Sequence, residues 1–590
     1  FLFAPKMHER YLMPVFPVLM LIFGRHRHTT LSYLIIGFIL AISQDVAIDH
    51  FYGAKQDVNG PVVAYGSLLI LASFGILLYR FYQSVIIGHD SKTPDRPVAL
   101  QTLRSTDLPG LHSLRNLPQP TRLTSRDLGL LFVVFMVNIF IHFYQLGATK
   151  IPTTRFFLKQ ETVFKFASSP QIRDVWIYSH TAHGTLNITC VQGTNPMKEI
   201  KFGVTNFYAW KKYSFGKPCR YEVNVNQTKL GRNGLAEIQF VTTSGNIVKP
   251  VEICEGQDCT RERSHPAIDE TGDQPQDYSY VTSTYFDEVY YARAAVELNQ
   301  GKFPYESTHP PLGKILGAWA IKAFGTAPFQ WRTLGSLQGC FIPILLFLIA
   351  WYVTYNRGIA FVTATLSTIE FSKIALSRMY TIDVYVTVWL LLGYLFTFVF
   401  GMNFLRHIRD GKGFYCTWKN LWPLIPAGIA IGLGLATKWV TVFTTAAILG
   451  IVGIILLIEW YRRSGDEGWK KAFPNRFILV AGGSLGIVPA LVYFIGYTPY
   501  YFMLNSGFSF EKFLSNQNSM WSYHSGLKAT HSFSSKFYSW PFVHLPVWLH
   551  SGESLLDGMR RTIVMMGNPI VWWGTIPAFV ALFYYKELRT

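Results

Sequence analysis

The stretch FDEVYYARAAVELNQGKFPYESTHPPLGK (286–314) carries two adjacent carboxylates, Asp287 and Glu288, at the head of a helical pattern. A carboxylate in an apolar setting is costly, so such a residue is a functional candidate, and it can serve as a general base. Successive residues of a helix point in different directions, so we expect only one of the two to face a substrate. A structural alternative is that Asp287 caps the helix while Glu288 lies in its first turn, where negative charge suits the helix dipole. The spacing leaves both interpretations open.

Further polar residues gather near the predicted outer ends of apolar runs. They are Arg332, Arg378, Asp383, Lys438 and Trp439. Each alone is typical of a membrane-edge residue whose polar head reaches the interface. Together with Asp287, they combine a base with cations that can hold an anionic phosphate. This combination predicts transfer chemistry on a phosphate-linked lipid.

The elements that must position these residues are apolar segments of membrane-spanning length. The 590-residue chain is 50% hydrophobic and only 15% charged, whereas soluble proteins are roughly a quarter charged. Runs close to the span of a bilayer recur, for example at 128–147, 333–355, 382–401 and 477–497. We therefore predict a polytopic α-helical membrane protein.

The formal net charge of +18 does not indicate a nucleic-acid partner. Many basic residues fall in short segments between apolar runs, at 24–28, 406–419 and 461–476. This pattern keeps loops cytoplasmic, whereas nucleic-acid binding needs a basic face. Alternation of the crossings then places residues 44–60, 149–330 and 498–560 outside the cytoplasm.

Four of the six cysteines lie in the predicted outer segment 149–330, namely Cys190, Cys219, Cys254 and Cys259. Disulfides persist in such a compartment, and four cysteines allow three pairings, which the sequence leaves open. The chain has no Walker A phosphate loop and no clustered Cys and His at zinc spacing. The residues themselves therefore indicate neither a nucleotide nor a metal.

The chain divides into several regions. Residues 1–83 predict terminal transmembrane helices of a preceding membrane module, and the polar, proline-bearing stretch 84–126 predicts a cytoplasmic linker. Residues 127–590 form the main membrane module. Within it, residues 151–275 contain short β-branched and aromatic runs bounded by Gly, Asn and Pro. These runs predict an inserted extracytoplasmic β-sandwich.

The acidic stretch closely resembles the first outer loop of the protein O-mannosyltransferases, which are polytopic glycosyltransferases of the GT-C fold. Similar segments follow in the family's order, namely LSRMYTIDVYVTVW (376–389), GLGLATKWV (432–440), MWSYHSGLKATHSFSSKFYSWPFVHLPVWLH (520–550) and MGNPIVWW (566–573). The resemblance implies a bacterial-type enzyme that moves mannose from polyprenyl- or dolichyl-phosphate mannose to Ser or Thr of secreted or membrane polypeptides. It also implies inversion at the sugar carbon and an active site on the extracytoplasmic face of a bacterial cell membrane.

The resemblance implies a role for each matching residue. Asp287 matches the catalytic carboxylate that takes the acceptor's proton, and Glu288 matches the neighbour that orients the acceptor or the sugar. Arg332, Arg378 and Lys438 match cations that would stabilise the leaving phosphate. Further candidates near the mouth of the site are His309, Asp383, Trp439, His524 and His531. The family needs no cofactor; related aminoarabinose transferases hold a divalent ion, so a metal stays open although no residues indicate one.

Several features depart from the family's pattern. Residues 498–560 are too short for the β-trefoil domain of eukaryotic members, and the β-rich insert would contact acceptor or glycan, or would only cover the site. We expect the family's last helices to be missing after MGNPIVWWGTIPAFVALFYY. The opening MHERYLMP resembles the end of another GT-C module, so we interpret the chain, which lacks an initiator Met, as a fragment of a tandem protein.

Two other functions are compatible with parts of the sequence. One is transfer of another lipid-phosphate-linked sugar, or transfer to a lipid or polysaccharide acceptor. The other is a transporter or a non-catalytic glycan-binding membrane protein. A transporter should show two similar halves with broken helices at matching places, and we see none in the sequence. A binding protein would not need Asp287 beside phosphate-facing cations. The sequence leaves the donor sugar, the acceptor and the oligomeric state open.

Overall fold

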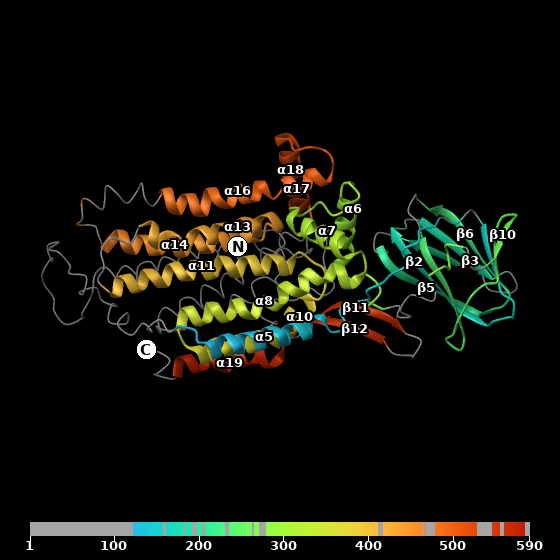
Figure 1. Cartoon of the computed structure of the whole chain (residues 1–590), viewed down its shortest axis with the longest axis horizontal. Helices are drawn as coiled ribbons and strands as arrows, with labels where there is room; N and C mark the ends of the chain where they lie inside the picture. Colours follow the sequence, from blue (N-terminus) through green and yellow to red (C-terminus); the bar gives the residue numbers. More distant parts are fainter. Residues whose placement is uncertain are drawn as a thin grey trace, which may run out of the picture.

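The computed structural model describes residues 122–584 apart from short gaps. The gaps are 157, 159–160, 182–183, 191–197, 203–206, 231–234, 262–264, 271–278, 411–416, 463–464, 466, 468–477, 528–545 and 555–559. The predicted helices of 1–83, the linker as far as residue 121, and His531 lie outside the described residues. A bundle of long helices carries a β-sandwich beyond one of its ends (Figure 1).

Among the described residues, five helices are long and apolar enough to cross a membrane, or six if the bent pair α9 and α10 forms one span. The long spans are α5 (Ser125–Phe143), α8 (Pro328–Thr354), α11 (Asp383–Arg409), α14 (Thr441–Arg462) and the segment Leu479–Met503. That segment comprises η4 (Ile478–Ile487), α16 (Val488–Ile495) and α17 (Thr498–Met503). Shorter helices are α9 (Arg357–Thr368), α10 (Phe371–Ser377), α12 (Trp418–Leu421), α13 (Leu424–Thr437) and α19 (Pro569–Tyr584). The predicted apolar runs coincide with helices, and the polytopic helical fold is confirmed.

Helices α8 and α11 pack together in the bundle, with α5 and α9 beside α8 and α13 beside α11. Small residues allow close approach of helices: a Cβ on Gly432 of α13 would lie 2.6 Å from Cβ of Val492. Helix α5 lies at the edge, and its apolar side chains Phe132 and Phe140 are 62% and 67% exposed. Such apolar exposure over a whole helix fits contact with lipid tails.

The insert is a sandwich of two antiparallel sheets. The larger sheet has the strand order β10-β9-β1-β6-β3-β4 and the smaller one β5-β2-β7-β8. The strands are β1 (Glu161–Lys165), β2 (Ile172–Thr181), β3 (Gly184–Cys190), β4 (Lys198–Phe202), β5 (Phe207–Cys219), β6 (Glu222–Leu230), β7 (Leu235–Thr242), β8 (Ile247–Val248), β9 (Glu252–Glu255) and β10 (Asp258–Arg261). Alternating apolar side chains of both sheets fill its core, among them Phe164, Ile177 and Phe240. The expected β-sandwich is confirmed.

The four outer cysteines form two disulfides in the sandwich. Cys190 pairs with Cys219, and Cys254 pairs with Cys259 across the neighbouring strands β9 and β10. The structure thus selects one of the three pairings that the sequence left open.

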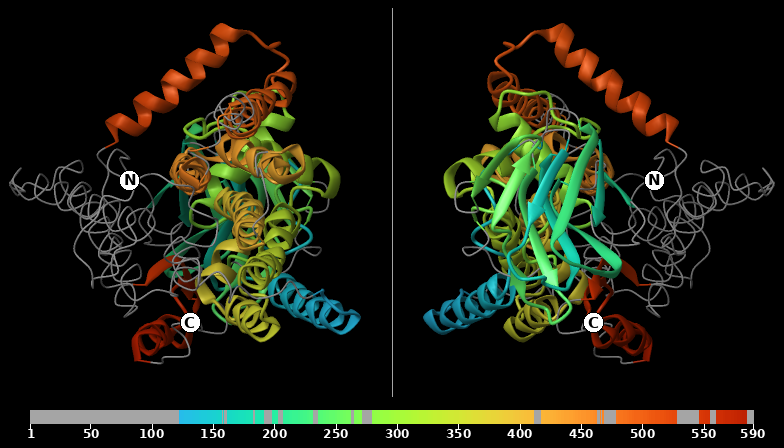
Figure 2. Two further views of the ribbon diagram at one scale, coloured as in Figure 1. Left: turned by 90° about the vertical axis from the view of Figure 1, so that its left-hand side faces the viewer. Right: turned by 90° about the vertical axis from the view of Figure 1, so that its right-hand side faces the viewer.

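Several short elements gather at the sandwich end of the bundle (Figure 1). They are α6 (Glu288–Asn299), α7 (Leu312–Phe324), α18 (Phe510–Gly526), β11 (Val547–Ser554) and β12 (Arg560–Met565). Seen along the bundle, the sandwich covers part of this end (Figure 2). Tyr178 and Tyr208 of the sandwich share one apolar core with Val296 of α6 and Trp331 of α8. The insert is therefore built onto the membrane domain, directly beside the acidic pair.

Candidate active site at the sandwich end of the bundle

The two adjacent carboxylates have different surroundings. Glu288 is fully buried and forms a two-pronged ion pair with Arg332: Nε lies 2.8 Å from Oε1, and Nη2 lies 2.7 Å from Oε2. Glu288 Oε1 also accepts the backbone N–H of Tyr380 at 3.0 Å. The other Arg332 donors reach the carbonyls of Leu146 and Ser283 at 2.9 and 2.8 Å. Every charged group of this pair is therefore satisfied inside the protein, as a buried ion pair requires.

Asp287 occupies the N-cap position of α6, but its side chain makes no capping hydrogen bond. Its backbone is helical, whereas a capping residue normally adopts an extended conformation. The residue is half-buried, and the preceding Phe286 has a left-handed φ of 49°. A bulky residue in that region is uncommon and often marks a functional turn. The capping interpretation of Asp287 is therefore wrong, while its separation from Glu288 agrees with the expected divergence of neighbouring side chains.

The sandwich holds the segment that leads into Asp287. Thr284 donates its backbone N–H to the Tyr208 carbonyl at 2.9 Å, and its hydroxyl bonds the Phe207 carbonyl. The backbone N–H of Trp210 reaches Ser283 Oγ at 3.2 Å. Strand β5 thus pairs with the chain three to four residues before Asp287.

A second ionic cluster lies in the loop between α6 and α7. The buried Lys314 ammonium is 2.7 Å from Glu306 Oε2 and also contacts the carbonyls of Glu306 and His309 at 3.0 and 2.7 Å. His309 Nδ1 lies 3.0 Å from Glu306 Oε1. Burial favours the neutral acid, yet the charge of Lys314 and the hydrogen bonds from His309 and Lys314 hold the pKa of Glu306 well below its usual value. Burial lowers the pKa of His309 to about 4, so its imidazole is neutral at pH 7.

Glu306 and Lys314 were not among the residues selected from the sequence. The sequence did contain a clue to them, because both residues lie within a few positions of His309 in ESTHPPLGK. A glutamate and a lysine beside an apolar helix predict an internal ion pair, which the spacing along one loop allows.

The cations predicted for phosphate binding have distinct environments. Arg332 is enclosed with Glu288, so its guanidinium faces that carboxylate. Lys438 pairs with Asp383 at 2.9 Å. Arg378 donates to the carbonyls at the end of α5, those of Ile141, Tyr144 and Gln145, at 2.9, 2.6 and 3.1 Å. A cation suits these carbonyls because they form the negative end of the helix dipole.

Helix α18 contributes the remaining described candidate. His524 Nε2 lies 2.7 Å from the Thr308 carbonyl, so this nitrogen carries the proton it donates. Its ring lies 5.2 Å from that of His309 and 6.2 Å from that of Trp439, measured between centroids. Trp439 in turn donates to the Tyr493 hydroxyl at 3.0 Å. The structure therefore brings His309, Trp439 and His524 together from three distant segments. Their rings contact one another, and among the described residues they do not form a group of metal ligands.

Tyr380 ties the two parts of the site to one another. Its backbone N–H bonds Glu288, and its hydroxyl donates to the Gly313 carbonyl of α7 at 3.2 Å. Its phenol packs on Gly317, where an added Cβ would lie only 1.6 Å from the hydroxyl oxygen. Gly317 is therefore required for this close approach.

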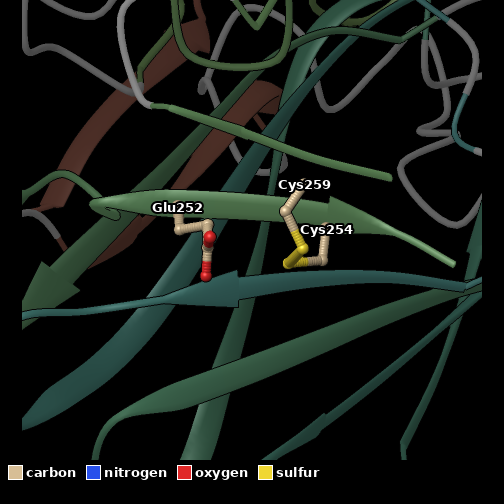
Figure 3. Close-up of side chains that lie close together, drawn as sticks. All are labelled: Glu252, Cys254 and Cys259. Carbon is tan, nitrogen blue, oxygen red and sulfur yellow. A yellow bond between two sulfur atoms is a disulfide. The ribbon is translucent and has the colours of Figure 1, made fainter. Parts of the chain in front are cut away.

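Among the described residues, two groups of acidic or sulfur ligands are close enough to share an ion, and both lie in the sandwich. In the first, Glu252 lies beside Cys254 and Cys259, which are joined as a disulfide (Figure 3). Oxidised sulfur is not the thiolate that a metal binds. The second group is Glu237, Asp269 and Glu270. Neither group includes a residue of the candidate active site.

Two family profiles match the chain. The profile described as dolichyl-phosphate-mannose-protein mannosyltransferase matches residues 276–505. The profile described as the C-terminal four TMM region of protein-O-mannosyltransferase matches residues 508–588. The first includes the acidic pair, the ionic loop and the three predicted phosphate cations, and the second includes His524.

Individual relatives share modest identity with this chain. A polyprenol-phosphate-mannose–protein mannosyltransferase of Corynebacterium glutamicum is 21% identical over 308 residues, which are 46% of this chain and 59% of the relative. The protein of the same name from Mycobacterium tuberculosis is 24% identical over 338 residues, 50% of this chain and 64% of the relative. A dolichyl-phosphate-mannose–protein mannosyltransferase 1 of Candida albicans is 27% identical over 246 residues, 38% of this chain and 26% of the relative. The chain thus spans about three fifths of the bacterial relatives it matches.

A solved structure of a Saccharomyces cerevisiae protein O-mannosyltransferase complex bound to the sugar donor is also similar. The match has 21% identity and a TM-score of 0.31, and it covers 37% of this chain and 30% of that one. The two profiles bear out the resemblance carried by the acidic stretch and the expected GT-C membrane fold, and the observed sheets bear out the inserted β-domain. From the segment before Asp287 to α19, the chain belongs to the protein O-mannosyltransferase family.

Proposed function

We propose that this chain catalyses transfer of mannose from polyprenyl-phosphate mannose to Ser or Thr hydroxyls of proteins. The observation that carries the proposal is the position of Asp287: it stands at the start of α6 without capping it, and its neighbour Glu288 is wholly engaged by Arg332. The names of the bacterial relatives support the donor and the protein acceptor.

In the proposed reaction, the acceptor hydroxyl oxygen attacks the anomeric carbon of mannose. The bond from that carbon to the phosphate oxygen breaks, and its electron pair leaves with the polyprenyl phosphate. Asp287 takes the hydroxyl proton as general base. Attack opposite to the leaving group inverts the anomeric centre. Glu288 is a positioning residue in this scheme, because its carboxylate is held by Arg332 and by the Tyr380 N–H.

The leaving phosphate gains negative charge, and a fixed cation would stabilise it. We favour Arg378 for this role, because its described hydrogen bonds go to neutral carbonyls and do not offset its charge with a carboxylate. Lys438 is partly neutralised by Asp383. Arg332 is reassigned from phosphate binding to support of Glu288, since its side chain is fully buried and its charge is paired with that carboxylate.

The reaction is proposed for the extracytoplasmic side of the membrane. Helix α6, which starts at the acidic pair, lies at the sandwich end of the bundle (Figure 1), and the sandwich carries two disulfides. Disulfides are typical of compartments outside the cytosol. The acceptors would therefore be secreted or membrane polypeptides.

The test is transfer of labelled mannose from polyprenyl-phosphate mannose to a Thr-containing peptide by membranes that carry the full-length protein. Asp287→Asn should lower the rate roughly a hundredfold to ten-thousandfold, the usual contribution of a positioned base. Its thermal unfolding in detergent should stay close to that of the wild type, because asparagine keeps the size of the side chain and no capping hydrogen bond to α6 is lost.

The matched control is Asp258→Asn, which removes an exposed carboxylate from the sandwich. This variant should keep full activity. Equal labelling by Asp287→Asn and the wild type would remove Asp287 from catalysis. Absence of labelling by the wild type would overturn the donor or the acceptor.

A further inference from the structure

A cleft of about 330 Å³ lies where the sandwich meets the membrane domain. Its walls come from the segment before β1, from β2 and β5, from the end of α6, and from α7 with the turn that follows it. Residues on these walls include Arg155, His180, Tyr208, Gln300, Lys322 and Thr326. None of the candidate catalytic residues lines the cleft.

The cleft carries positive charge. Of its eleven described lining residues, two are cations, Arg155 and Lys322, and none is Asp or Glu. Glu270, whose charge acts on the lining residue His180, accepts hydrogen bonds from the N–H and hydroxyl groups of Thr153 and from the Thr154 N–H at 2.6, 2.7 and 3.1 Å. No carboxylate among the described lining residues balances these two cations.

The guanidinium of Arg155 is held in place by neutral groups. Its Nε donates to His180 Nδ1 at 3.1 Å, and it also hydrogen-bonds the Tyr208 side chain. His180 is 3% exposed, and its Nε2 donates to the Pro152 carbonyl at 2.6 Å. Burial lowers the pKa of His180 to about 4, so the ring stays neutral and orients Arg155 without competing for an anion. A guanidinium fixed in this way suits the paired oxygens of a carboxylate.

The cleft is connected to the catalytic segment in two ways. Helix α6 runs from Asp287 at its start to Asn299 and Gln300 at the cleft, and its 12 residues correspond to about 18 Å. Tyr208 lines the cleft with its side chain, while its carbonyl accepts the N–H of Thr284. Tyr208 also has a left-handed φ of 44°, a strained conformation for an aromatic residue.

We propose that this cleft is an acceptor subsite that binds the carboxylate side chain of an Asp or Glu in the polypeptide being modified. The inference rests on the proposed function, since it specifies the acceptor of that site. An extended peptide covers about 18 Å in roughly five or six residues, so the acidic residue would stand at that spacing from the modified Ser or Thr. A protein acceptor is favoured over a lipid head group because one wall is the sandwich, which lies beyond the end of the bundle (Figure 1).

The test compares two peptides that each hold one Thr and differ only in Glu or Gln six residues away. With the wild type, the Glu peptide should have a KM roughly threefold to fivefold lower at equal kcat, the effect of one exposed ion pair. The preference should weaken with added salt. It should vanish in Arg155→Gln/Lys322→Gln and persist in the control Arg220→Gln/Lys249→Gln, which removes two exposed cations elsewhere on the sandwich.

A second readout separates this inference from the proposed function. Binding of the same two peptides, labelled with a fluorophore, to purified protein in detergent needs no turnover. Charge-dependent binding that is lost in Arg155→Gln/Lys322→Gln supports the subsite even if no mannose is transferred. Equal binding and equal KM for both peptides would overturn it. A different result would also overturn the subsite: Arg155→Gln/Lys322→Gln loses activity only in phosphatidylglycerol vesicles, and the wild type does not prefer the Glu peptide. That result would assign the cleft to a lipid head group.

Discussion

Arg332 and Glu288 form an ion pair with no exposed surface, in which two nitrogens of the guanidinium meet both carboxylate oxygens at 2.8 and 2.7 Å. The pair joins α8 to the first turn of α6 and lies one residue from Asp287. Its position links the stability of the membrane domain to the placement of the proposed base.

Removing one member of this pair should leave a buried, unpaired charge. We expect Glu288→Gln or Arg332→Met to destabilise the protein by about 3 to 5 kcal/mol. The double variant Glu288→Gln/Arg332→Met should lose less than the sum, because neither charge is left alone. Thermal unfolding in detergent measures both. Additive losses would show that the two side chains act independently.

Replacing Arg378 by Gln should lower kcat/KM for the donor roughly a hundredfold, as loss of one fixed charge at a developing oxyanion does. The KM for the acceptor should not change. Arg378→Lys keeps a charge but not the fork that reaches the α5 carbonyls, so it should recover only part of the rate. Steady-state kinetics with each substrate varied in turn distinguishes these outcomes. A change confined to acceptor KM would argue against a phosphate contact.

The buried His309 should make stability depend on pH in a defined window. Its pKa is about 4 in the folded protein, against 6.5 for the free side chain. As pH falls below 6.5 the unfolded chain takes up a proton that the folded chain does not, so stability is lost between pH 6.5 and about 4. His309→Gln should therefore lose about 3 kcal/mol less stability than the wild type across this pH range.

Two other groups set the limits of that measurement. The pKa of His180 is also lowered to about 4, so this residue makes stability fall over the same pH range. The effect of His309 is therefore measured as the difference between the stability curves of the wild type and His309→Gln. The pKa of Glu306 is lowered in the folded protein, so its contribution to stability is fully present above pH 4.5, the pKa of the unfolded side chain. This contribution is lost only as the pH falls below 4.5. Identical pH profiles for the wild type and His309→Gln would contradict the assignment.

The two disulfides should differ in their contribution to the sandwich. Cys190 and Cys219 are 29 residues apart, whereas Cys254 and Cys259 are 5 apart. Because a longer loop removes more entropy from the unfolded chain, Cys190→Ala/Cys219→Ala should cost about 3.5 kcal/mol and Cys254→Ala/Cys259→Ala about 2 kcal/mol. Thermal unfolding of the two paired variants tests the order. The reverse order would indicate that the longer loop stays ordered without its crosslink.

Gly317→Ala should disturb the site through Tyr380. The new Cβ would meet the buried phenol, which also bonds Gly313, and crowding of this kind costs about 1 to 3 kcal/mol. Because the Tyr380 N–H holds Glu288, transfer activity should fall as well. Gly450→Ala is the matched control, since its Cβ would meet no atom within 4 Å. Equal behaviour of the two variants would show that Tyr380 can move without cost.

Much of this architecture follows from local patterns in the chain. Runs of apolar residues determined the membrane helices, because a bilayer accepts only segments of that length and character. The change to short β-branched runs determined the sandwich. The acidic stretch, SRMYTID and TKW together identified the family, and they contain seven of the described candidate residues.

The partners of these residues were decided only by the tertiary structure. An arginine such as Arg332 has the same sequence signature whether it meets a phosphate or a carboxylate. Its assignment to Glu288 depends on how α8 packs against α6, 44 residues away along the chain. The Cys190–Cys219 disulfide and the contact of β5 with Thr284 are likewise formed between separate segments of the chain. Local patterns report burial and element type, whereas the choice of partner is made by packing between segments distant in the chain, which no spacing encodes.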